Sequence, residues 1–374
     1  MDNKKKKIFI ITGEFSGDKH AAAVTREIRK IMPDCIIEGV GESNLEAQGV
    51  KLFRNHEKMG KVGLTPSMIF NHIFLGIDII NYLKNEYKPD LVLLVDYGAF
   101  NLQISKRLKK EGIKCFYFIP PQIWASRKWR IKALKKNVDK VLTIFPFEKD
   151  FYEREGLKSE FVGHPIKFEL PECNKREEFF KKHNLDPNKK LIGVFCGSRI
   201  FEIKFLLKTF LAAVKLIEKA RSDVQFVFSK AKSLPENAFS VPYLTLKDEN
   251  HALLAYSDAL ILASGTVALE AAIYQTPMLI AYRAPLFFYL VYLLVRSIKK
   301  ACLVNIITGG DYVEEYIMFR ATPKNIANEI NEILDNPKKK EHILQGCRLT
   351  SQMLGDKHCA ENVARIIKEE LTGA

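Results

Sequence analysis

The alternation of short apolar runs with helical patterns most constrains the fold of this chain. In the first half, apolar runs typical of strands occupy residues 8–12, 91–96, 115–119, 140–145 and 161–162. Between them lie helical patterns such as HAAAVTREIRKIM and NLQISKRLKKEG, the second of which ends in lysines and a glycine. Strands that alternate with helices usually run parallel in one sheet, so this half is expected to form βαβ units.

A polar stretch with three prolines then divides the chain, and the alternation starts again after it. The stretch is GHPIKFELPECNKREEFFKKHNLDPNKK, which has the composition of a linker. Strand-like runs follow as KLIGVFC, VQFVFSK, ALILAS and PMLIAY. The sequence therefore predicts an α/β protein with two Rossmann-like domains, residues 1–168 and 169–350, that face each other across a cleft. A C-terminal helix within residues 351–374 is expected to return to the first domain.

The charge and the cysteines of the chain narrow the classes of partner and cofactor. The 374 residues include 58 Lys and Arg against 44 Asp and Glu, a net charge of +14, which favours nucleic acid, an anionic membrane or phosphorylated small molecules. No basic stretch matches a nucleic-acid-reading module, so we expect no nucleic acid as a partner. The seven cysteines form no CxxC pair, and no HExxH motif occurs. We therefore expect no metal, no other cofactor and a reducing compartment.

Two apolar stretches bear on membrane binding. The longest apolar run, residues 284–295, has 12 residues, whereas a spanning helix needs roughly 20. Residues 63–83 form either a core helix or a segment that lies in a membrane interface or binds an acyl chain. At the N-terminus the apolar stretch ends after five residues, so we expect no signal peptide and a cytoplasmic protein.

A glycine turn that opens the second half has the pattern of a phosphate site. In IGVFCGSRIFEI a strand delivers Gly197 and Ser198 to a helix start, with Arg199 at the tip and Glu202 one turn in. Backbone N–H groups at a helix start attract anions, and a guanidinium matches phosphate oxygens. The alternative is a plain helix cap with a solvated arginine.

A second turn, ASGTVALEAAI, repeats this architecture. Ser264, Gly265 and Thr266 can offer N–H and hydroxyl groups to a second anionic oxygen. Glu270 lies one helical turn further, where its carboxylate can accept hydrogen bonds from ribose hydroxyls. Together the two turns predict a nucleotide-diphosphate pocket. The alternative is an ordinary capped helix with Glu270 in a surface ion pair.

The turn after the first strand, GEFSGDKH, shares the strand–turn–helix pattern but is acidic. Glu14 and Asp18 suit the hydroxyl groups of a sugar better than a phosphate, and Ser16 and His20 belong to the same turn. No G-x-G-x-x-G pattern follows any strand, so a dinucleotide site is not indicated. We therefore expect this turn to contact hydroxyl groups, such as those of a sugar, and not a phosphate.

Two further features of the first half carry candidate residues. Asp96 ends the run LVLLVD at the carboxyl edge of the predicted sheet, as either a general base or the N-cap of the next helix. The stretch FIPPQIWASRKWRIKALKK mixes Trp124 and Trp129 with basic residues such as Arg127. This mixture fits nucleic acid, an acidic glycolipid or lipid headgroup, or a cationic surface helix with two packing tryptophans.

Taken in order, these motifs resemble those of the lipid-A-disaccharide synthases, inverting glycosyltransferases (family 19) of Gram-negative bacteria with the two-domain GT-B fold. GEFSGDKHAA is similar to the family's GEASGDLHGA, and FIPPQIWASR is similar to VSPSVWAWR. IFPFEKDFYEREGLKSEFVGHPI is similar to LPFEKAFY…VEFVGHPL, and GSRIFEI matches PGSRxxEI. ASGTVALEAA matches SGTATLEAA, and LVNIITGGDYVEEYI resembles LPNILAGREVVPELL. The resemblance runs nearly end to end.

The resemblance implies an activity and its sites. The family transfers 2,3-diacylglucosamine from its UDP derivative to 2,3-diacylglucosamine 1-phosphate (lipid X), forming a β-1,6 disaccharide in lipid A biosynthesis. Asp96 would be the base, and Arg199 would stabilise the departing diphosphate without a metal. The implied UDP contacts are Gly197, Ser198, Arg199, Glu202, Ser264, Gly265, Thr266, Glu270 and Asn305, and the implied acceptor contacts are Glu14, Ser16, Asp18, His20, Trp124 and Arg127.

The resemblance further implies that the protein docks peripherally on the cytoplasmic face of the inner membrane. A homodimer is compatible with the resemblance but is not implied by it. Four positions depart from the family pattern: Ala99 replaces a second aspartate (IDAPDFN), Cys196 replaces the proline before Gly197, Ser126 replaces the second tryptophan of WAW, and Gly310 replaces the arginine of AGRE. If the family's base is the aspartate at position 99, Asp96 must substitute for it. Two other hypotheses therefore stay open: a related GT-B enzyme of the UDP-sugar epimerase type, and a non-catalytic relative that binds glycolipid.

Overall fold

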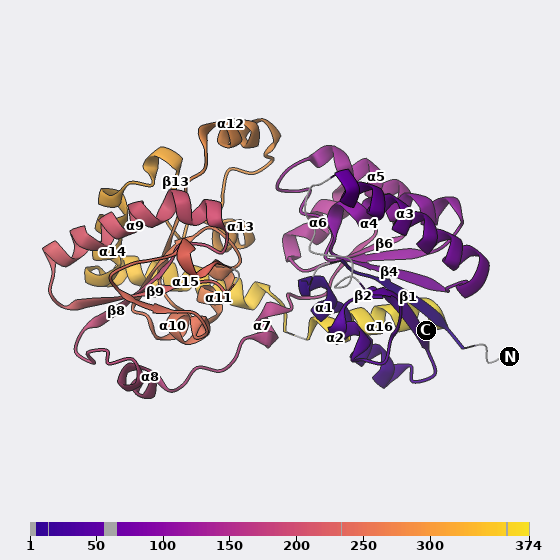
Figure 1. Ribbon diagram of the computed structural model, residues 1–374, viewed down its shortest axis with the longest axis horizontal. Coiled ribbons are helices and arrows are strands. Elements are labelled where there is room, and N and C mark those ends of the chain that lie inside the picture. Colours follow the sequence, from indigo (N-terminus) through magenta and orange to yellow (C-terminus); the bar gives the residue numbers. More distant parts are fainter. Residues whose placement is uncertain (1–4, 14, 56–65, 233, 357, 374) are drawn as a thin grey trace. The chain divides into compact units, whose positions relative to one another are not determined.

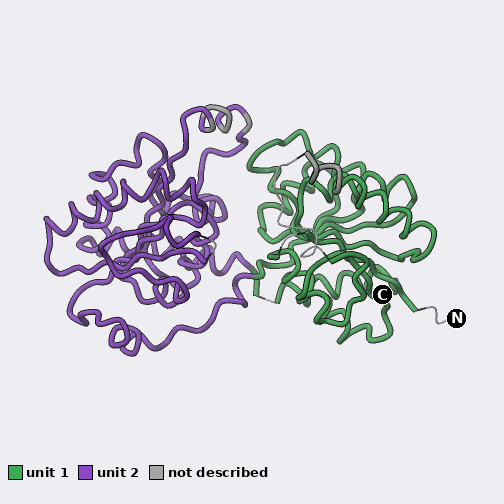
Figure 2. The backbone as a smooth tube through the Cα atoms, viewed as in Figure 1, with its two compact units in different colours: residues 1–165, 355–374 green, residues 166–354 purple. Residues whose placement is uncertain are grey.

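Figure 1 shows the chain as a computed structural model, which describes residues 5–13, 15–55, 66–232, 234–356 and 358–373. The chain divides into two compact units (Figure 2). Unit 1 comprises residues 1–165 together with 355–374, and unit 2 comprises residues 166–354. Each unit has its own parallel sheet and its own apolar core.

Unit 1 is built on a parallel sheet that, within the described residues, has seven strands in the order β3-β2-β1-β4-β5-β6-β7. The strands are β1 (Lys7–Ile11), β2 (Ile36–Gly41), β3 (Lys51–Asn55), β4 (Leu91–Val95), β5 (Cys115–Phe118), β6 (Lys140–Thr143) and β7 (Ser159–Phe161). Strands β2 and β3 are added on one side of β1, and the later strands are added on the other side from β4 onward. The carboxyl ends of β1 and β4 therefore form the switch point at which such sheets bind ligands.

Helices cover both faces of this sheet (Figure 1). They are α1 (Phe15–Ile31), α2 (Ser43–Glu46), α3 (Pro66–Tyr82), α4 (Gly98–Lys110), α5 (Ile131–Asn137), α6 (Pro146–Arg154) and α16 (Cys359–Thr372), with a π-helical turn η2 (Leu83–Tyr87) and a 3-10 turn η3 (Lys128–Arg130). Side chains of α3, α4 and α5 share a core with Phe9, Val92 and Leu94 of the sheet. The last helix, α16, packs on α1, so the C-terminus belongs to the first unit.

Unit 2 repeats the plan with a parallel sheet that has six strands among the described residues, in the order β10-β9-β8-β11-β12-β13. Its strands are β8 (Lys190–Phe195), β9 (Val224–Ser229), β10 (Leu244–Leu246), β11 (Ala259–Ala263), β12 (Met278–Tyr282) and β13 (Glu315–Ile317). The switch point of this sheet lies between β8 and β11. Its helices are α7 (Ile166–Glu169), α8 (Arg176–Lys182), α9 (Ile200–Ala220), α10 (Asn250–Tyr256), α11 (Val267–Ile273), α12 (Leu286–Val295), α13 (Leu303–Thr308), α14 (Pro323–Asp335) and α15 (Pro337–Met353), with 3-10 turns η4 (Glu236–Ala238) and η5 (Met318–Arg320).

The strands that the sequence predicts are present, and their ends in the structure differ slightly from the predicted ends. Each strand-like run falls on a strand of the structure with ends within two residues, but β2, β3, β10 and β13 were not predicted. Three of these four strands lie at sheet edges, and β10 and β13 have only three residues each, too few for a periodic signal. The expected domain ends at 168 and 350 fall inside α7 and α15, and the structure divides the chain after residues 165 and 354 instead.

The two apolar stretches form helices with mixed exposure. Helix α3 packs into the core through Leu75 and Ile79, as a core helix does. Exposed apolar side chains on these helices are Ile73, Phe74 and Ile77 of α3 and Leu286, Phe287 and Leu294 of α12. In the described parts of the chain, no helix combines the length and the apolar character needed to cross a membrane.

Candidate functional site

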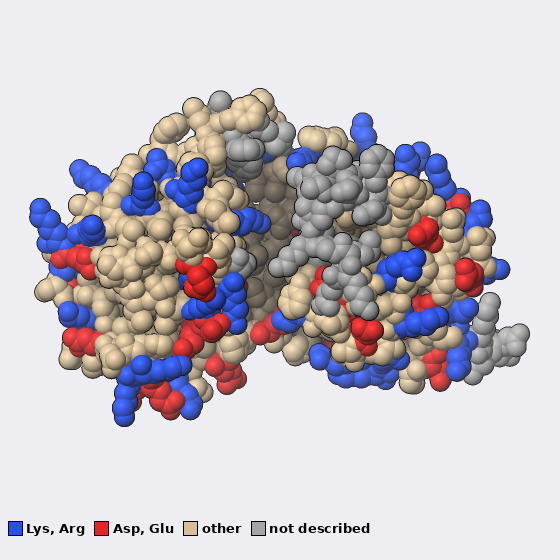
Figure 3. All heavy atoms as spheres, viewed as in Figure 1, with Lys and Arg blue, Asp and Glu red and all other residues tan. Residues whose placement is uncertain are grey.

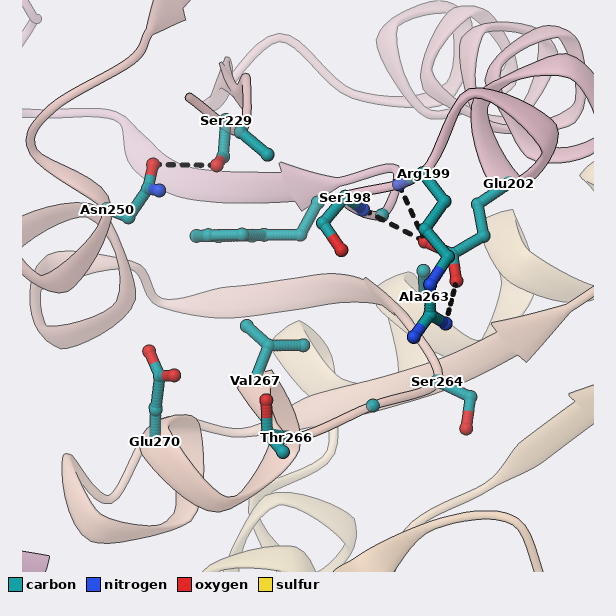
Figure 4. A pocket seen from close by; sticks show the side chains of 14 residues that line it. Ser198, Arg199, Glu202, Ser229, Asn250, Ala263, Ser264, Thr266, Val267 and Glu270 are labelled. Atoms are coloured by element: carbon teal, nitrogen blue, oxygen red, sulfur yellow. Dashed lines mark hydrogen bonds and ion pairs between the residues drawn. The ribbon is translucent and has the colours of Figure 1, made fainter. Parts of the chain in front are cut away.

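A pocket opens in unit 2 at the carboxyl ends of β8 and β11, the switch point of its sheet (Figure 4). Its volume of about 390 Å³ lies in the range of small-ligand sites. The pocket brings together eight of the nine residues predicted to bind the donor nucleotide, which are Gly197, Ser198, Arg199, Glu202, Ser264, Gly265, Thr266 and Glu270. The two glycine turns therefore meet in one place.

The carboxylate of Glu202 binds the backbone of the first glycine turn, which includes Gly197 and Ser198. Its Oε2 accepts hydrogen bonds from the backbone N–H groups of Ser198 (2.9 Å) and Arg199 (3.2 Å), and its Oε1 lies 3.2 Å from Arg199 Nη1. Gly197 has a φ of +103°, and a Cβ atom there would overlap the Glu202 carboxylate. The two N–H groups are thus occupied, which corrects the expectation that they are free for a phosphate. The group that this turn offers to a ligand is the guanidinium of Arg199, a side chain that is 70% exposed.

The second turn forms the facing part of the pocket. The Ser264 hydroxyl donates a hydrogen bond to the backbone oxygen of Ala301 (3.1 Å), which anchors the turn to the segment before α13. Thr266 is the N-cap residue of α11, and Gly265 and Val267 line the pocket beside it. This turn therefore presents a hydroxyl group and a glycine backbone to the pocket, which Arg199 of the first turn also lines.

Glu270 places a carboxylate on the pocket wall beside a histidine. Its Oε2 lies 3.5 Å from Nδ1 of His251, in the first turn of α10. Burial raises the pKa of Glu270 to about 7, because the ionised form loses its hydration. A carboxylate in this setting can accept hydrogen bonds from hydroxyl groups of a ligand, as expected for a ribose.

Two polar residues that line the pocket, Ser229 and Asn250, were not predicted from the sequence. Ser229 ends β9, and its hydroxyl donates a hydrogen bond to Asn250 Oδ1 (2.7 Å) at the start of α10. The signal for Ser229 was present, since a polar residue at the carboxyl end of a strand next to β8 lies on the ligand edge of the sheet. Asn250 belongs to no motif and follows a strand of only three residues, so nothing in the sequence marked it.

Asn305 is the one predicted nucleotide contact that lies outside the pocket. Its side chain is buried and bound to a neighbouring loop: Nδ2 donates to the backbone oxygen of Val313 (2.7 Å) and to Glu315 Oε1 (2.9 Å). Its Oδ1 accepts from the N–H groups of Tyr312 and Val313. Asn305 therefore fixes the loop after α13, and the expectation that it contacts UDP is corrected.

In unit 1, Asp96 lies where the sequence placed it, at the switch point of the sheet. Asp96 and Tyr97 both follow β4 with positive φ angles, 48° and 54°, a strained backbone that clusters at functional sites. The Asp96 backbone oxygen accepts hydrogen bonds from Asn101 Nδ2 (2.9 Å) and the Tyr117 hydroxyl (2.8 Å), which hold this conformation. The N-cap position of α4 is Tyr97, so the N-cap alternative for Asp96 is wrong.

The opening turn lies beside Asp96, but one of its acidic residues has a structural role. A Cβ atom on Gly17 would lie 3.5 Å from Asp96 Cβ, so the first turn of α1 approaches that residue closely. Asp18 is fully buried, and its carboxylate accepts hydrogen bonds from the backbone N–H groups of residues 42, 44 and 45 at the start of α2. The expectation that Asp18 holds a sugar is therefore wrong. Ser16 is exposed and His20 half-buried, while Glu14 lies outside the described residues.

The aromatic and basic stretch divides into a buried and an exposed tryptophan. Trp124 is buried, and its Nε1 donates a hydrogen bond to Glu148 Oε1 (2.7 Å). Burial also raises the pKa of Glu148 to about 7. The prediction that Trp124 contacts the acceptor is therefore corrected, because its ring and its N–H are both used inside unit 1. Arg127 and Trp129 are exposed.

Within the described residues, no group of three or more His, Cys, Asp or Glu side chains is placed to hold a metal ion.

Comparisons with known sequences agree over nearly the whole chain. A family model described as lipid-A-disaccharide synthetase matches residues 8–367. The lipid-A-disaccharide synthase of Geobacter metallireducens is 33% identical over 375 residues, which cover 98% of this chain and 97% of that protein. The lipid-A-disaccharide synthase of Coxiella burnetii (strain CbuG_Q212) is 34% identical over 374 residues, which cover 98% of each chain.

Solved structures share the fold at low sequence identity. The S. aureus MnaA–UDP structure has a TM-score of 0.67 at 14% identity, covering 98% of this chain and 97% of that one. A glycosyltransferase from Rickettsia africae has a TM-score of 0.61 at 14% identity, covering 99% of this chain and 100% of that one. A putative UDP-N-acetylglucosamine 2-epimerase from Listeria monocytogenes has a TM-score of 0.65 at 15% identity, covering 99% and 98%. These likenesses confirm the predicted GT-B fold.

Proposed function

Because the chain belongs to the lipid-A-disaccharide synthase family and is thus a glycosyltransferase, we propose that it transfers 2,3-diacylglucosamine from its UDP derivative to 2,3-diacylglucosamine 1-phosphate. The products are UDP and the β-1,6-linked tetraacyl disaccharide 1-phosphate, formed with inversion at the anomeric carbon. The observation that carries the proposal is the unit 2 pocket, where two turns of the family pattern meet at the switch point of a Rossmann-like sheet.

The nucleotide of the donor occupies the unit 2 pocket. Its diphosphate lies against the exposed Arg199 guanidinium, which pairs with Glu202, and against the turn that includes Thr266. Glu270 accepts hydrogen bonds from the ribose hydroxyls. The positive charge of Arg199 next to the diphosphate stabilises the negative charge that develops on UDP as it departs.

Asp96 is the base of the reaction. Its carboxylate takes the proton of the acceptor 6-hydroxyl while that oxygen bonds to the anomeric carbon of the donor. The bond from the anomeric carbon to the diphosphate breaks, and its electron pair leaves on UDP. The strained, hydrogen-bonded backbone at Asp96 supports this assignment, because backbone strain of this kind clusters at functional sites and persists only where neighbouring groups hold it. Ala99 stands in place of the family's second aspartate. Asp96 therefore supplies the carboxylate in the segment VDYGAFN, residues 95–101.

Ser16, His20 and Arg127 are the described residues that we retain as acceptor contacts, together with Glu14. Ser16 and His20 lie in the first turns of α1, whose Gly17 packs close to Asp96. The Arg127 side chain is exposed and carries the positive charge that suits the 1-phosphate of the acceptor.

The protein acts as a peripheral enzyme on the cytoplasmic face of the inner membrane. This proposal is supported by the exposed apolar side chains of α3 and α12 and by the net charge of +14. On the face drawn in Figure 3, Lys and Arg side chains lie over both units and are interspersed with Asp and Glu. Replacing Phe74 and Phe287 by serine should lower binding to anionic lipid vesicles in a sedimentation assay. The homodimer stays a prediction, which the molecular mass of the protein in solution tests.

Substitution of the proposed base tests the mechanism. Asp96→Asn should lower kcat for disaccharide formation about 10²–10⁴-fold and leave the KM for the UDP donor nearly unchanged. Asp34→Asn, which makes the same change at an exposed residue, is the matched control and should keep full activity. Full activity of Asp96→Asn would refute the assignment of the base.

A further inference from the structure

Ser229 and Asn250 form a hydrogen-bonded pair on the pocket wall that the donor contacts proposed above do not use. The pair joins the end of β9 to the start of α10, and both residues line the pocket. Ser229 is buried, whereas Asn250 is half-buried and borders the space of the pocket. Polar side chains that converge on a ligand pocket usually fix the orientation of the ligand.

The position of the pair within the pocket indicates which part of a nucleotide would reach it. Figure 4 shows Arg199, Glu202 and Ser264 toward one end of the pocket and Asn250 and Glu270 toward the other. His251, in the first turn of α10, lies 3.5 Å from Glu270, so this turn borders the proposed ribose site. Since the base of a nucleotide is bonded to its ribose, a base whose ribose lies at Glu270 falls next to Asn250.

The hydrogen bond from Ser229 decides what Asn250 offers to that base. The Ser229 hydroxyl donates to Oδ1 of Asn250 at 2.7 Å, so the amide oxygen is engaged and the amide is held in one orientation. The Nδ2 group carries the two N–H donors of the side chain. Phe195 and Val267 line the same pocket and provide apolar surface for a flat ring.

From this geometry we infer that Asn250 reads the nucleobase of the donor by donating a hydrogen bond from Nδ2 to the O4 carbonyl oxygen of uracil, with Ser229 as its positioning residue. The inference rests on the proposed UDP donor. Uracil carries the carbonyl acceptor O4, whereas cytosine carries the amino donor N4 at that position. Cytosine would set one donor against another and leave both unpaired, which is the kind of mismatch that gives strong discrimination.

Nucleotide titrations of the full chain test the inference. We expect the wild-type protein to bind UDP roughly ten- to a hundredfold more tightly than CDP by calorimetry, the ratio that corresponds to one unpaired polar group. In Asn250→Asp the carboxylate still accepts from Ser229 but now faces the base with an acceptor, so the UDP/CDP affinity ratio should fall to about one or below. Ser229→Ala should lower the UDP/CDP affinity ratio, because the Asn250 amide loses the hydrogen bond that holds it in one orientation. The ratio is the readout, because the added charge weakens both diphosphates alike.

Asn188→Asp is the matched control, since it adds the same charge at an exposed residue before β8, at the opposite end of the sheet from the pocket. It should keep the wild-type ratio. An unchanged ratio in Asn250→Asp, or in Ser229→Ala, which adds no charge, would overturn the inference. A wild-type protein that binds neither UDP nor CDP would instead refute the proposed function, so the two failures are distinguishable.

Discussion

Replacement of Glu202 by glutamine tests whether this residue holds the turn after β8 in place or binds the nucleotide of the donor. In the structure the Glu202 carboxylate accepts two backbone hydrogen bonds and pairs with Arg199. A hydrogen bond to an ionised group contributes about 1 kcal/mol more than a neutral one, so neutralising the acceptor of two bonds costs about 2 kcal/mol. The exposed ion pair with Arg199 adds at most about 1 kcal/mol. For a unit of this size, about 2–3 kcal/mol corresponds to a fall in Tm of roughly 4–12 °C.

Thermal unfolding and UDP titration of the same variant give the two readouts. Glu202→Gln should lower the Tm of unit 2 while UDP affinity stays near the wild-type value or rises, because a negative charge beside the diphosphate has been removed. Arg199→Ala should lower UDP affinity roughly ten- to a hundredfold. Glu218→Gln, on the same helix and hydrogen-bonded to the Tyr243 hydroxyl (2.8 Å), controls for helix effects. Unchanged stability together with a tenfold loss of UDP affinity in Glu202→Gln would refute this reasoning.

Two further predictions concern the buried Asp18 and the half-buried Glu270. Asp18→Asn weakens three hydrogen bonds to the start of α2 and should destabilise unit 1 by about 3 kcal/mol in thermal unfolding; a raised acceptor KM at wild-type stability would instead show that Asp18 binds substrate. Glu270 has its pKa raised from 4.5 to about 7, so the folded state holds a proton that the unfolded state releases in that range, and stability falls as pH rises from about 4.5 to 7. Glu270→Gln removes this loss, so its Tm should exceed the wild-type Tm at pH 8 and match it near pH 4.5; the same Tm difference at both pH values would contradict the raised pKa.

The fold could be predicted because its main strands are apolar runs that a parallel sheet buries on both faces. β4 and β11, for example, consist of buried residues throughout, and such runs stand out from polar helices and turns. The pocket could be predicted for a related reason. Parallel strands bring their carboxyl ends to one edge, so the glycine turns after β8 and β11 had to lie near each other.

The direction and partners of individual side chains could not be predicted from the pattern. Asp18, Trp124 and Asn305 are polar or aromatic residues within recognisable motifs, yet the structure turns each toward backbone or side-chain partners inside its own unit. Their partners lie 7 to 27 residues away in sequence, at spacings that no local pattern encodes. Motif position therefore located the turns that line the pocket of unit 2, but it did not separate side chains that face the pocket from those that bond within their own unit.

The most direct test of the central claim is the product formed by the purified full-length chain with UDP-2,3-diacylglucosamine and 2,3-diacylglucosamine 1-phosphate, measured by mass spectrometry and NMR. The account predicts one UDP released for each β-1,6-linked tetraacyl disaccharide 1-phosphate formed. Release of UDP without disaccharide, formation of an α linkage, or binding of the donor with no consumption of either substrate would contradict it.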